Sequence, residues 1–457
     1  MKKENFFKVF LLSFSMLFIL IQGCGSGGGG DKSQNREEGI YIPSNVKMLK
    51  IEPFIPDVNR DNVKYIEVSD TASLQSAIDN AEPYTTITLL DGIYDEIIIR
   101  NKQYLTIRAK NRLESSFSNK LADNGIHIEN SSYITIQDFL AQDFKNYFIF
   151  SPSWKEVKDE NGASQRLYEP ASHHIYISGC EIRQQVAGIF SGANSHDWTV
   201  DRCSFHDLTK SYAWYSLGYH HTLQNSLLYK IDNFYMSIRG YVAKYGENEV
   251  IPRVADIPDL NSKRLDYGDW THLIINNTFG VQVDNFIGEG DSDRGAGIAF
   301  YVGGKNALDG KNADEDERRY LPPQNVHIEN NIFYYNHGGD GIYMNKNYGF
   351  NKNDVSHGLP IFGTVLKNNV TNGKKLITTQ YEPDLTMITN FATVQGSNTK
   401  DVLDSELGLN APQDNDYTLQ NDAVLLIDKG SRSNYDPKYD FSGKKRGTVV
   451  DIGAFEL

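Results

Sequence analysis

Four residues in the second half of the chain have side chains that could bind a carboxylate and move a proton. They are Arg239, His337, Tyr343 and Lys346. A guanidinium can neutralise a carboxylate through paired hydrogen bonds, and an imidazole, a phenol or an amine can act as a general base once its pKa is shifted. This set suits β-elimination of a uronate sugar, in which the carboxylate is neutralised and a base removes the C5 proton. We therefore expect Arg239 to be the neutralising group and Lys346, Tyr343 or His337 to be the base.

Further aromatic and polar residues lie in the same stretches of sequence and could hold a sugar polymer. Aromatic rings could stack on sugar faces, while polar side chains could bind hydroxyl and carboxylate groups. The residues expected to bind substrate are Tyr215, His220, Tyr241, Arg294, Tyr301 and Asn345.

The acidic stretch "GEGDSDRG" suggests two other chemistries. Its residues Glu289, Asp291 and Asp293 could bind Ca²⁺ through carboxylate oxygens, although the full EF-hand spacing is missing. A glycoside hydrolase would instead need two carboxylates roughly 5–10 Å apart, and Asp291 with Asp340 could supply them. A third alternative is a surface protein that binds glycan or adheres without catalysis.

The elements that would position these residues repeat along the chain. The shared pattern is apolar, any, apolar, any, two small or polar residues, any, apolar. Its copies are "YITIQDFLA" (133–141), "IYISGCEI" (175–182), "WTVDRCSF" (198–205), "HTLQNSLL" (221–228), "HLIINNTF" (272–279), "VHIENNIF" (326–333) and "TVLKNNVT" (364–371). The second apolar positions, Ile136, Ile177, Val200, Leu223, Ile274, Ile328 and Leu366, are separated by 41, 23, 23, 51, 54 and 38 residues. A period near 23 predicts the coils of an all-β solenoid, a single-stranded right-handed parallel β-helix.

The paired small or polar residues of the pattern predict a bend that stacks from coil to coil. Asparagine suits such a bend because it tolerates the left-handed region and bonds its own backbone. This register makes Cys180 and Cys203 neighbours in adjacent coils, either as reduced thiols or as a disulfide.

A second strand is expected after each bend, and the loops between coils vary in length. The expected second strands are 188–192, 212–217, 234–239, 297–302, 341–346 and 375–379. In the copy at 326–345, "HGGDG" is therefore first a turn between two strands. The insertions fall at about 152–171, 240–269, 284–323 and 346–361. Because insertions on a solenoid collect on one face, we expect them to form the walls of a groove for a polymer.

The first 23 residues predict a lipoprotein signal peptide. Lysines flank the apolar run "VFLLSFSMLFILI", and "IQGC" resembles a lipobox that would place a lipid on Cys24. The expected organisation is a signal at 1–23, a flexible tether at 24–45, a capped β-helix at 46–421 and a C-terminal capping segment at 422–457. We expect a monomer anchored by its lipid in the bacterial cell envelope, on the surface or periplasmic face of the outer membrane. The net charge of −14 argues against a nucleic-acid partner.

Two segments resemble known secreted proteins of the pectate-lyase-like superfamily. Residues 73–109, with "DGIY", resemble the opening of the chondroitinase B and alginate lyase family, and 422–457 resemble a C-terminal segment of bacterial β-helix surface proteins. The resemblance implies a helix that caps the core, inserted loops and a polysaccharide lyase activity, with Ca²⁺ as a cofactor in some members. In that family, a lysine on one coil is followed by an arginine about one coil later. Lys346 in "YMNKNYG" resembles the lysine, but "LITTQYE", on the next coil, contains no arginine.

The function expected from the sequence is therefore degradation of an extracellular polysaccharide at the cell surface. β-Elimination of a uronate-containing glycan is favoured over hydrolysis by paired carboxylates and over glycan binding alone.

Overall fold

The structure is a computed structural model of the chain, and the residues it describes all lie in the compact unit Ile42–Leu457. They are residues 53–57, 63–158, 162, 164–193, 195–209, 212–232, 234–243, 272–281, 297–301, 318–321, 326–334, 341–344, 364–373, 376–379, 392–395, 398–432, 435 and 437–457.

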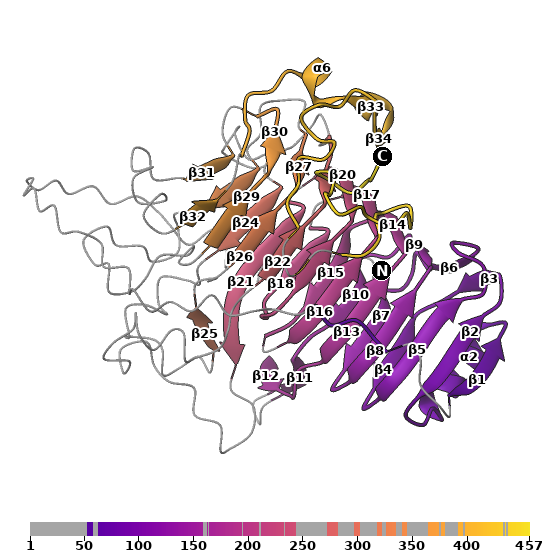
Figure 1. Cartoon of the computed structure of the whole chain (residues 1–457). Helices are drawn as coiled ribbons and strands as arrows, with labels where there is room; N and C mark the ends of the chain where they lie inside the picture. The colour runs from indigo at the N-terminus through magenta and orange to yellow at the C-terminus, as the bar shows by residue number, and fades with distance from the viewer. Residues whose placement is uncertain are drawn as a thin grey trace, which may run out of the picture. The chain divides into compact units, whose positions relative to one another are not determined.

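Three long sheets, here called A, B and C, hold nearly all the strands in the described part of the chain. In each of them, strands pair in parallel and join in the order of the sequence (Figure 1). Sheet A contains β1 (Lys64–Val68), β2 (Thr85–Leu89), β5 (Gln103–Ala109), β8 (Ser132–Gln137), β13 (His173–Ser178), β16 (His196–Asp201), β19 (Thr222–Gln224), β22 (His272–Ile275), β26 (Val326–Glu329), β29 (Thr364–Lys367) and β32 (Ala392–Gln395). Sheet B contains β3 (Gly92–Tyr94), β6 (Ser115–Ser118), β9 (Leu140–Gln142), β14 (Glu181–Gln185), β17 (Ser204–Leu208), β20 (Leu227–Ile231), β23 (Thr278–Phe279), β27 (Ile332–Phe333) and β30 (Val370–Thr371). Sheet C contains β4 (Ile97–Arg100), β7 (Asn124–Glu129), β10 (Tyr147–Ser151), β15 (Ala187–Ser191), β18 (Trp214–Ser216), β21 (Met236–Ala243), β24 (Ile298–Tyr301), β28 (Ile342–Met344) and β31 (Ile377–Thr379).

The chain runs from sheet A to B to C and back to A, which confirms the right-handed parallel β-helix. The expectation of two strands per coil was incomplete, because each coil has three. The repeated pattern spans two of them: in "VHIENNIF", β26 lies in sheet A and β27 in sheet B, with the bend between them. Strands as short as β27 have only two residues, too few to show an alternation in the sequence.

The stacking of the coils follows the register expected from the repeat. Ile136 pairs with Ile177, Ile177 with Val200, and Val200 with Leu223. The series continues through Ile274, Ile328 and Leu366 in the same register. All seven side chains are buried, so this row of the core was predicted correctly from the sequence.

The bend between sheets A and B uses two residues in each coil. The first has a left-handed backbone, and the second points its side chain into the core, where these side chains stack from coil to coil as a ladder. The first residue of each pair has a positive φ, as at Arg202 (52°) and Asn276 (56°). In the later coils the second residue is asparagine, and the Nδ2 of Asn277 donates to the Oδ1 of Asn331 at 3.0 Å, as Asn331 does to Asn369. In the earlier coils Cys180 and Cys203 occupy the ladder as two buried free thiols.

Helices and a C-terminal segment cover parts of the β-helix. Helix α2 (Thr71–Asp79) begins at a capping box formed by Asp70 and Ser73 and buries Leu74 and Ile78 beside the first strands. The C-terminal elements are α6 (Asp404–Leu407), β33 (Leu409–Ala411), the 3-10 helix η3 (Pro412–Asp414) and β34 (Asp416–Leu419).

The C-terminal segment runs beside sheet B, as the yellow chain in Figure 1 shows. Leu407, Tyr417 and Ile452 pack against Ile332 and Val370 of that sheet. The exact domain boundaries expected from the sequence stay a prediction. No helix within the described residues is long and apolar enough to span a membrane.

The insertions lie mostly between sheets C and A. The first contains the hairpin of β11 (Trp154–Lys158) and β12 (Ser164–Tyr168). Two others follow β21 and β28, in agreement with loops that leave from one edge of sheet C. The insertion expected at 284–323 was placed too broadly, because β24 interrupts it and pairs with both β21 and β28. That pairing keeps the coil continuous.

Candidate functional site

Sheet C brings together four of the residues expected in the site. Phe190 pairs with Tyr215, Tyr215 with Ser237, and Arg239 with Tyr301. Tyr343 pairs with Ala299, two residues before Tyr301. Because successive residues of a strand alternate between the faces, Tyr215, Arg239, Tyr301 and Tyr343 occupy positions of one face across four strands. Their neighbours in sequence, such as Trp214, Ile238 and Ile342, fill the buried face.

Strand β21 continues beyond sheet C and pairs there with a strand that carries two arginines. Its last four residues pair antiparallel with β25 (Arg318–Leu321), which sets Tyr241 opposite Tyr320 and Val242 opposite Arg319. Arg318 lies opposite Ala243. Arg239, Arg318 and Arg319 therefore come from segments about 80 residues apart and lie on two paired strands. The two arginines of β25 were not predicted from the sequence, in which the pair "RR" after the acidic run "DEDE" is their only signal.

Tyr215 belongs to an aromatic cluster on the outer face of sheet C. Its ring stacks on Phe190 at 5.4 Å between centroids, and Phe190 lies 5.1 Å from Phe150. Trp154 of the β11–β12 hairpin meets Phe190 edge-on at 5.5 Å. Tyr215 is half-buried and the hairpin holds this cluster partly covered, so most of these rings pack against protein.

A further group of the expected residues falls outside the described part of the chain. They are the base candidates His337 and Lys346, the substrate candidates Arg294 and Asn345, the calcium candidates Glu289, Asp291 and Asp293, the carboxylate Asp340, and the lipidation site Cys24. Their roles, including calcium binding, stay predictions.

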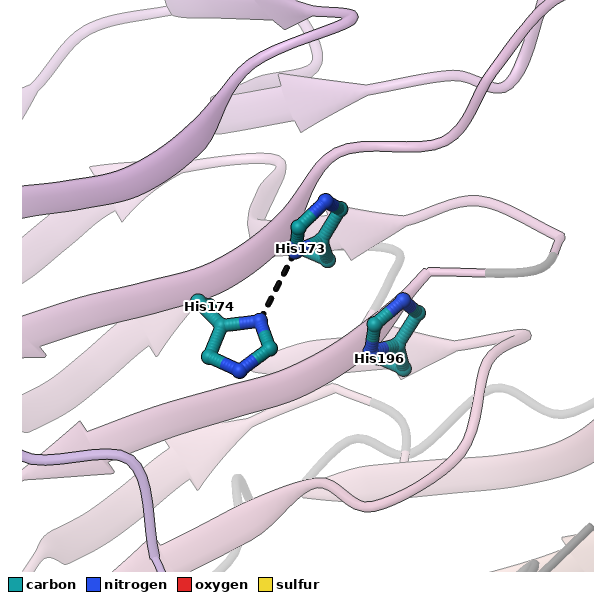
Figure 2. A group of neighbouring side chains, drawn as sticks. All are labelled: His173, His174 and His196. Atoms are coloured by element: carbon teal, nitrogen blue, oxygen red, sulfur yellow. Dashed lines mark hydrogen bonds between the residues drawn. The ribbon is translucent and has the colours of Figure 1, made fainter. Parts of the chain in front are cut away.

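His220 belongs to a different place, the corner where sheet C returns to sheet A. It precedes β19, and its Nδ1 lies 3.5 Å from the Oδ1 of Asp197. Asp197 also accepts a hydrogen bond at 2.6 Å from the Nδ1 of His196. One coil earlier, the Nδ1 atoms of His173 and His174 are 2.7 Å apart. Figure 2 shows His173, His174 and His196 grouped where β13 and β16 begin.

Burial and mutual proximity keep this corner in a defined protonation state. Burial, followed by the neighbouring His196 and His174, lowers the pKa of His173 to about 4. Burial likewise lowers the pKa of His174. Burial alone would raise the pKa of Asp197, but hydrogen bonds from His196 and His220 outweigh it and hold that pKa well below its usual range. At pH 7 the imidazoles of His173 and His174 are therefore neutral beside the ionised carboxylate of Asp197.

Of the corner residues named above, only His220 was expected in the site from the sequence, although the sequence contains a signal for the others. "HH" at 173–174, "HD" at 196–197 and "HH" at 220–221 each stand just before an apolar strand pattern, at spacings of 23 and 24 residues. The repeat is defined by its apolar positions, so the residues just before each copy carried no prediction.

No protein-family model matches the chain, and no curated protein matches it. Several solved structures are similar to it. A structure titled pectate lyase Pel9A has a TM-score of 0.46 and 14% identity over 86% of this chain and 96% of the other. Alginate lyase from Paenibacillus sp. str. FPU-7 has a TM-score of 0.39 and 11% identity over 74% of this chain and 98% of the other. The catalytic unit of a GH87 alpha-1,3-glucanase from Streptomyces thermodiastaticus has a TM-score of 0.44 and 12% identity over 77% of this chain and 56% of the other. Likenesses this distant carry no argument about activity.

Proposed function

We propose that the chain acts on an extracellular anionic polysaccharide and cleaves a uronate-containing glycan by β-elimination. The observation that carries the proposal is the pairing of β21 with both β24 and β25. It brings the positions of Arg239 and Arg318 to one edge of sheet C, on the same face by register, in a chain with a net charge of −14. Arg319, opposite Val242, takes the other face of the same pair of strands. A local group of arginines in an acidic protein is what an anionic polymer would need for binding.

The chemistry assigned to this edge follows from the residue types. A guanidinium pairs well with a planar carboxylate, which suits Arg239 for neutralising the uronate. A base then removes the C5 proton, the electron pair forms the C4–C5 double bond, and the bond from C4 to the glycosidic oxygen breaks. The departing oxygen takes a proton from an acid. Tyr343, on the same face of sheet C by register, is our candidate for the base.

The test is the absorbance near 232 nm, where the unsaturated product absorbs. The purified full chain, solubilised in detergent, would be mixed with alginate, pectate, chondroitin, heparin-type and ulvan polymers, with and without Ca²⁺. We expect a rise with at least one polymer. Arg239→Ala should lower kcat/KM about 100-fold, the loss of roughly 3 kcal/mol of transition-state stabilisation. Tyr343→Phe should lower kcat with little change in KM.

A matched control separates the arginine edge from a general charge effect. Arg183 lies on sheet B and pairs with Glu181 at 2.8 Å, so Arg183→Ala should leave activity unchanged. Arg318→Ala with Arg319→Ala should mainly raise KM, and more so at low salt. New reducing ends without a rise in absorbance at 232 nm would mean that the chain cleaves the polymer by hydrolysis and not by elimination. Binding without either product would reduce the function to glycan recognition.

A further inference from the structure

We propose that His173, His174 and His196 form a binding site for a first-row transition metal ion such as Zn²⁺, at the corner between sheets C and A. One nitrogen of each imidazole can be chosen so that all three lie within 4.8 Å of one another. Figure 2 shows the three side chains as neighbours where β13 and β16 begin. The site uses none of the arginines of β21 and β25 and does not depend on the proposed lyase activity.

A backbone feature explains why two consecutive histidines share one site. Side chains of adjacent residues in a strand normally point to opposite faces. His174 has a φ of 54°, in the left-handed region, which interrupts the alternation at the second residue of β13. The Nδ1 atoms of His173 and His174 consequently face each other at 2.7 Å. Tetrahedral Zn²⁺ holds nitrogens at about 2.0–2.1 Å, which places two ligands about 3.3 Å apart. The rings of His173 and His196 are stacked in almost parallel planes, so one of them must turn out of the stack before both in-plane lone pairs can reach one ion.

The neighbouring coil supplies the third ligand together with a group that orients it. The Nδ1 of His196 lies 2.6 Å from the Oδ2 of Asp197, so that nitrogen donates and the other ring nitrogen keeps its lone pair. Metal-bound histidines typically donate their second nitrogen to a carboxylate in this way. Asp197 also approaches the Nε2 of His174 at 3.7 Å, so one carboxylate serves two of the three ligands.

The donor set selects the class of ion. Neutral imidazole nitrogens suit Zn²⁺, Cu²⁺ and Ni²⁺, whereas Ca²⁺ and Mg²⁺ take oxygen ligands. Three protein ligands leave a fourth position of a tetrahedral ion for water or for a group of a bound molecule. About a quarter of the side-chain surface of His174 and of His196 is exposed, which gives an ion access from solvent.

Ring stacking offers a purely structural explanation that an experiment can separate from metal binding. His173 stacks on His196 at 4.6 Å, and His196 stacks on Tyr219 at 5.1 Å. A phenylalanine at 173 would keep the stack and remove a ligand. His206 supplies the matched control, since it also lies 2.7 Å from its neighbour Asp207 and stacks on Tyr229 at 4.7 Å. It lies on sheet B, away from the three histidines.

The test is calorimetric titration of Zn²⁺ into the full chain, purified without a polyhistidine tag, stripped of metal and solubilised in detergent. We expect His173→Phe to remove one equivalent of bound Zn²⁺ or to weaken its binding at least about tenfold. His206→Phe should bind Zn²⁺ like the wild type. Zn²⁺ should also raise the Tm of the wild type and of His206→Phe but not of His173→Phe. Equal binding by His173→Phe and the wild type, or equal losses in both variants, would overturn the site.

A second measurement covers the case in which His173→Phe does not fold. Co²⁺ added to the wild-type chain should give the visible absorption of a tetrahedral nitrogen site, and Zn²⁺ should displace it. His174→Gln should abolish that absorption while the far-ultraviolet circular dichroism stays unchanged. A Co²⁺ spectrum that survives His174→Gln would contradict the proposal, and so would an octahedral spectrum in the wild type.

Discussion

The bend between sheets A and B and the corner between sheets C and A are both built on residues with a positive φ, but they are filled differently. In the later coils the bend repeats one residue type, and Asn277, Asn331 and Asn369 bond one another in sequence. At the corner the left-handed positions change from tyrosine to histidine to aspartate, as at Tyr133, His174 and Asp197.

This difference suggests that the bend serves the scaffold and that the corner can hold a functional site. In the later coils, an asparagine in the bend donates to a backbone carbonyl and to the next asparagine, so neighbouring rungs there depend on the same side chain. Stacked rings at the corner impose no such rule, since Tyr104 on Tyr133 and Tyr133 on His174 are similar contacts, with centroids 4.4 and 4.5 Å apart. The corner is therefore free to carry chemistry that changes from coil to coil.

The largest effect should come from breaking the bend at Asn331. Its Oδ1 accepts from both the backbone and the side chain of Asn277, and its Nδ2 donates to Ile274 and Asn369. Asn331→Ala leaves these buried groups without partners, which should lower the free energy of unfolding by about 4 kcal/mol. Denaturation by guanidinium would measure it.

The control for this prediction is an asparagine with a similar bond on the surface. Asn410 is exposed and its Nδ2 donates to the Oγ1 of Thr418 at 2.8 Å. Asn410→Ala should cost under about 1 kcal/mol. If the two variants lost the same stability, the buried asparagines of the bend would contribute no more to the fold than an asparagine on the surface.

A smaller effect should come from an inward histidine near the corner. His272, the first residue of β22, is fully buried, and burial lowers its pKa to about 3. An unfolded histidine has a pKa near 6.5. Between these values the unfolded chain holds the extra proton, so His272 stabilises the fold fully above pH 6.5 and progressively less as the pH falls toward 3.

His272→Leu isolates this effect. Between pH 7.5 and pH 4 the wild type should lose up to about 3 kcal/mol more of its free energy of unfolding than the variant does. Guanidinium denaturation at both pH values gives the comparison. Parallel losses in the two proteins would mean that folding does not lower the pKa of His272.

The same contrast explains what the sequence could predict. Seven apolar positions, from Ile136 to Leu366, were aligned correctly because the core repeats with the coil. The arginines of β25 could not be placed, because the antiparallel pairing with β21 leaves no periodic trace. His173 and His174 were missed because a left-handed residue breaks the alternation on which strand predictions depend.

The smallest effect should come from removing a ring at the corner. Tyr104 stacks on Tyr84 at 4.7 Å and on Tyr133 at 4.4 Å. Tyr104→Ala should lower the free energy of unfolding by only about 1 kcal/mol, since such pairs contribute about that much beyond area burial. Tyr65→Ala, at an exposed site, should change it by less than about 0.5 kcal/mol. A loss at Tyr104 as large as that expected for Asn331→Ala would make the corner part of the scaffold, and its changing residues would no longer point to a site.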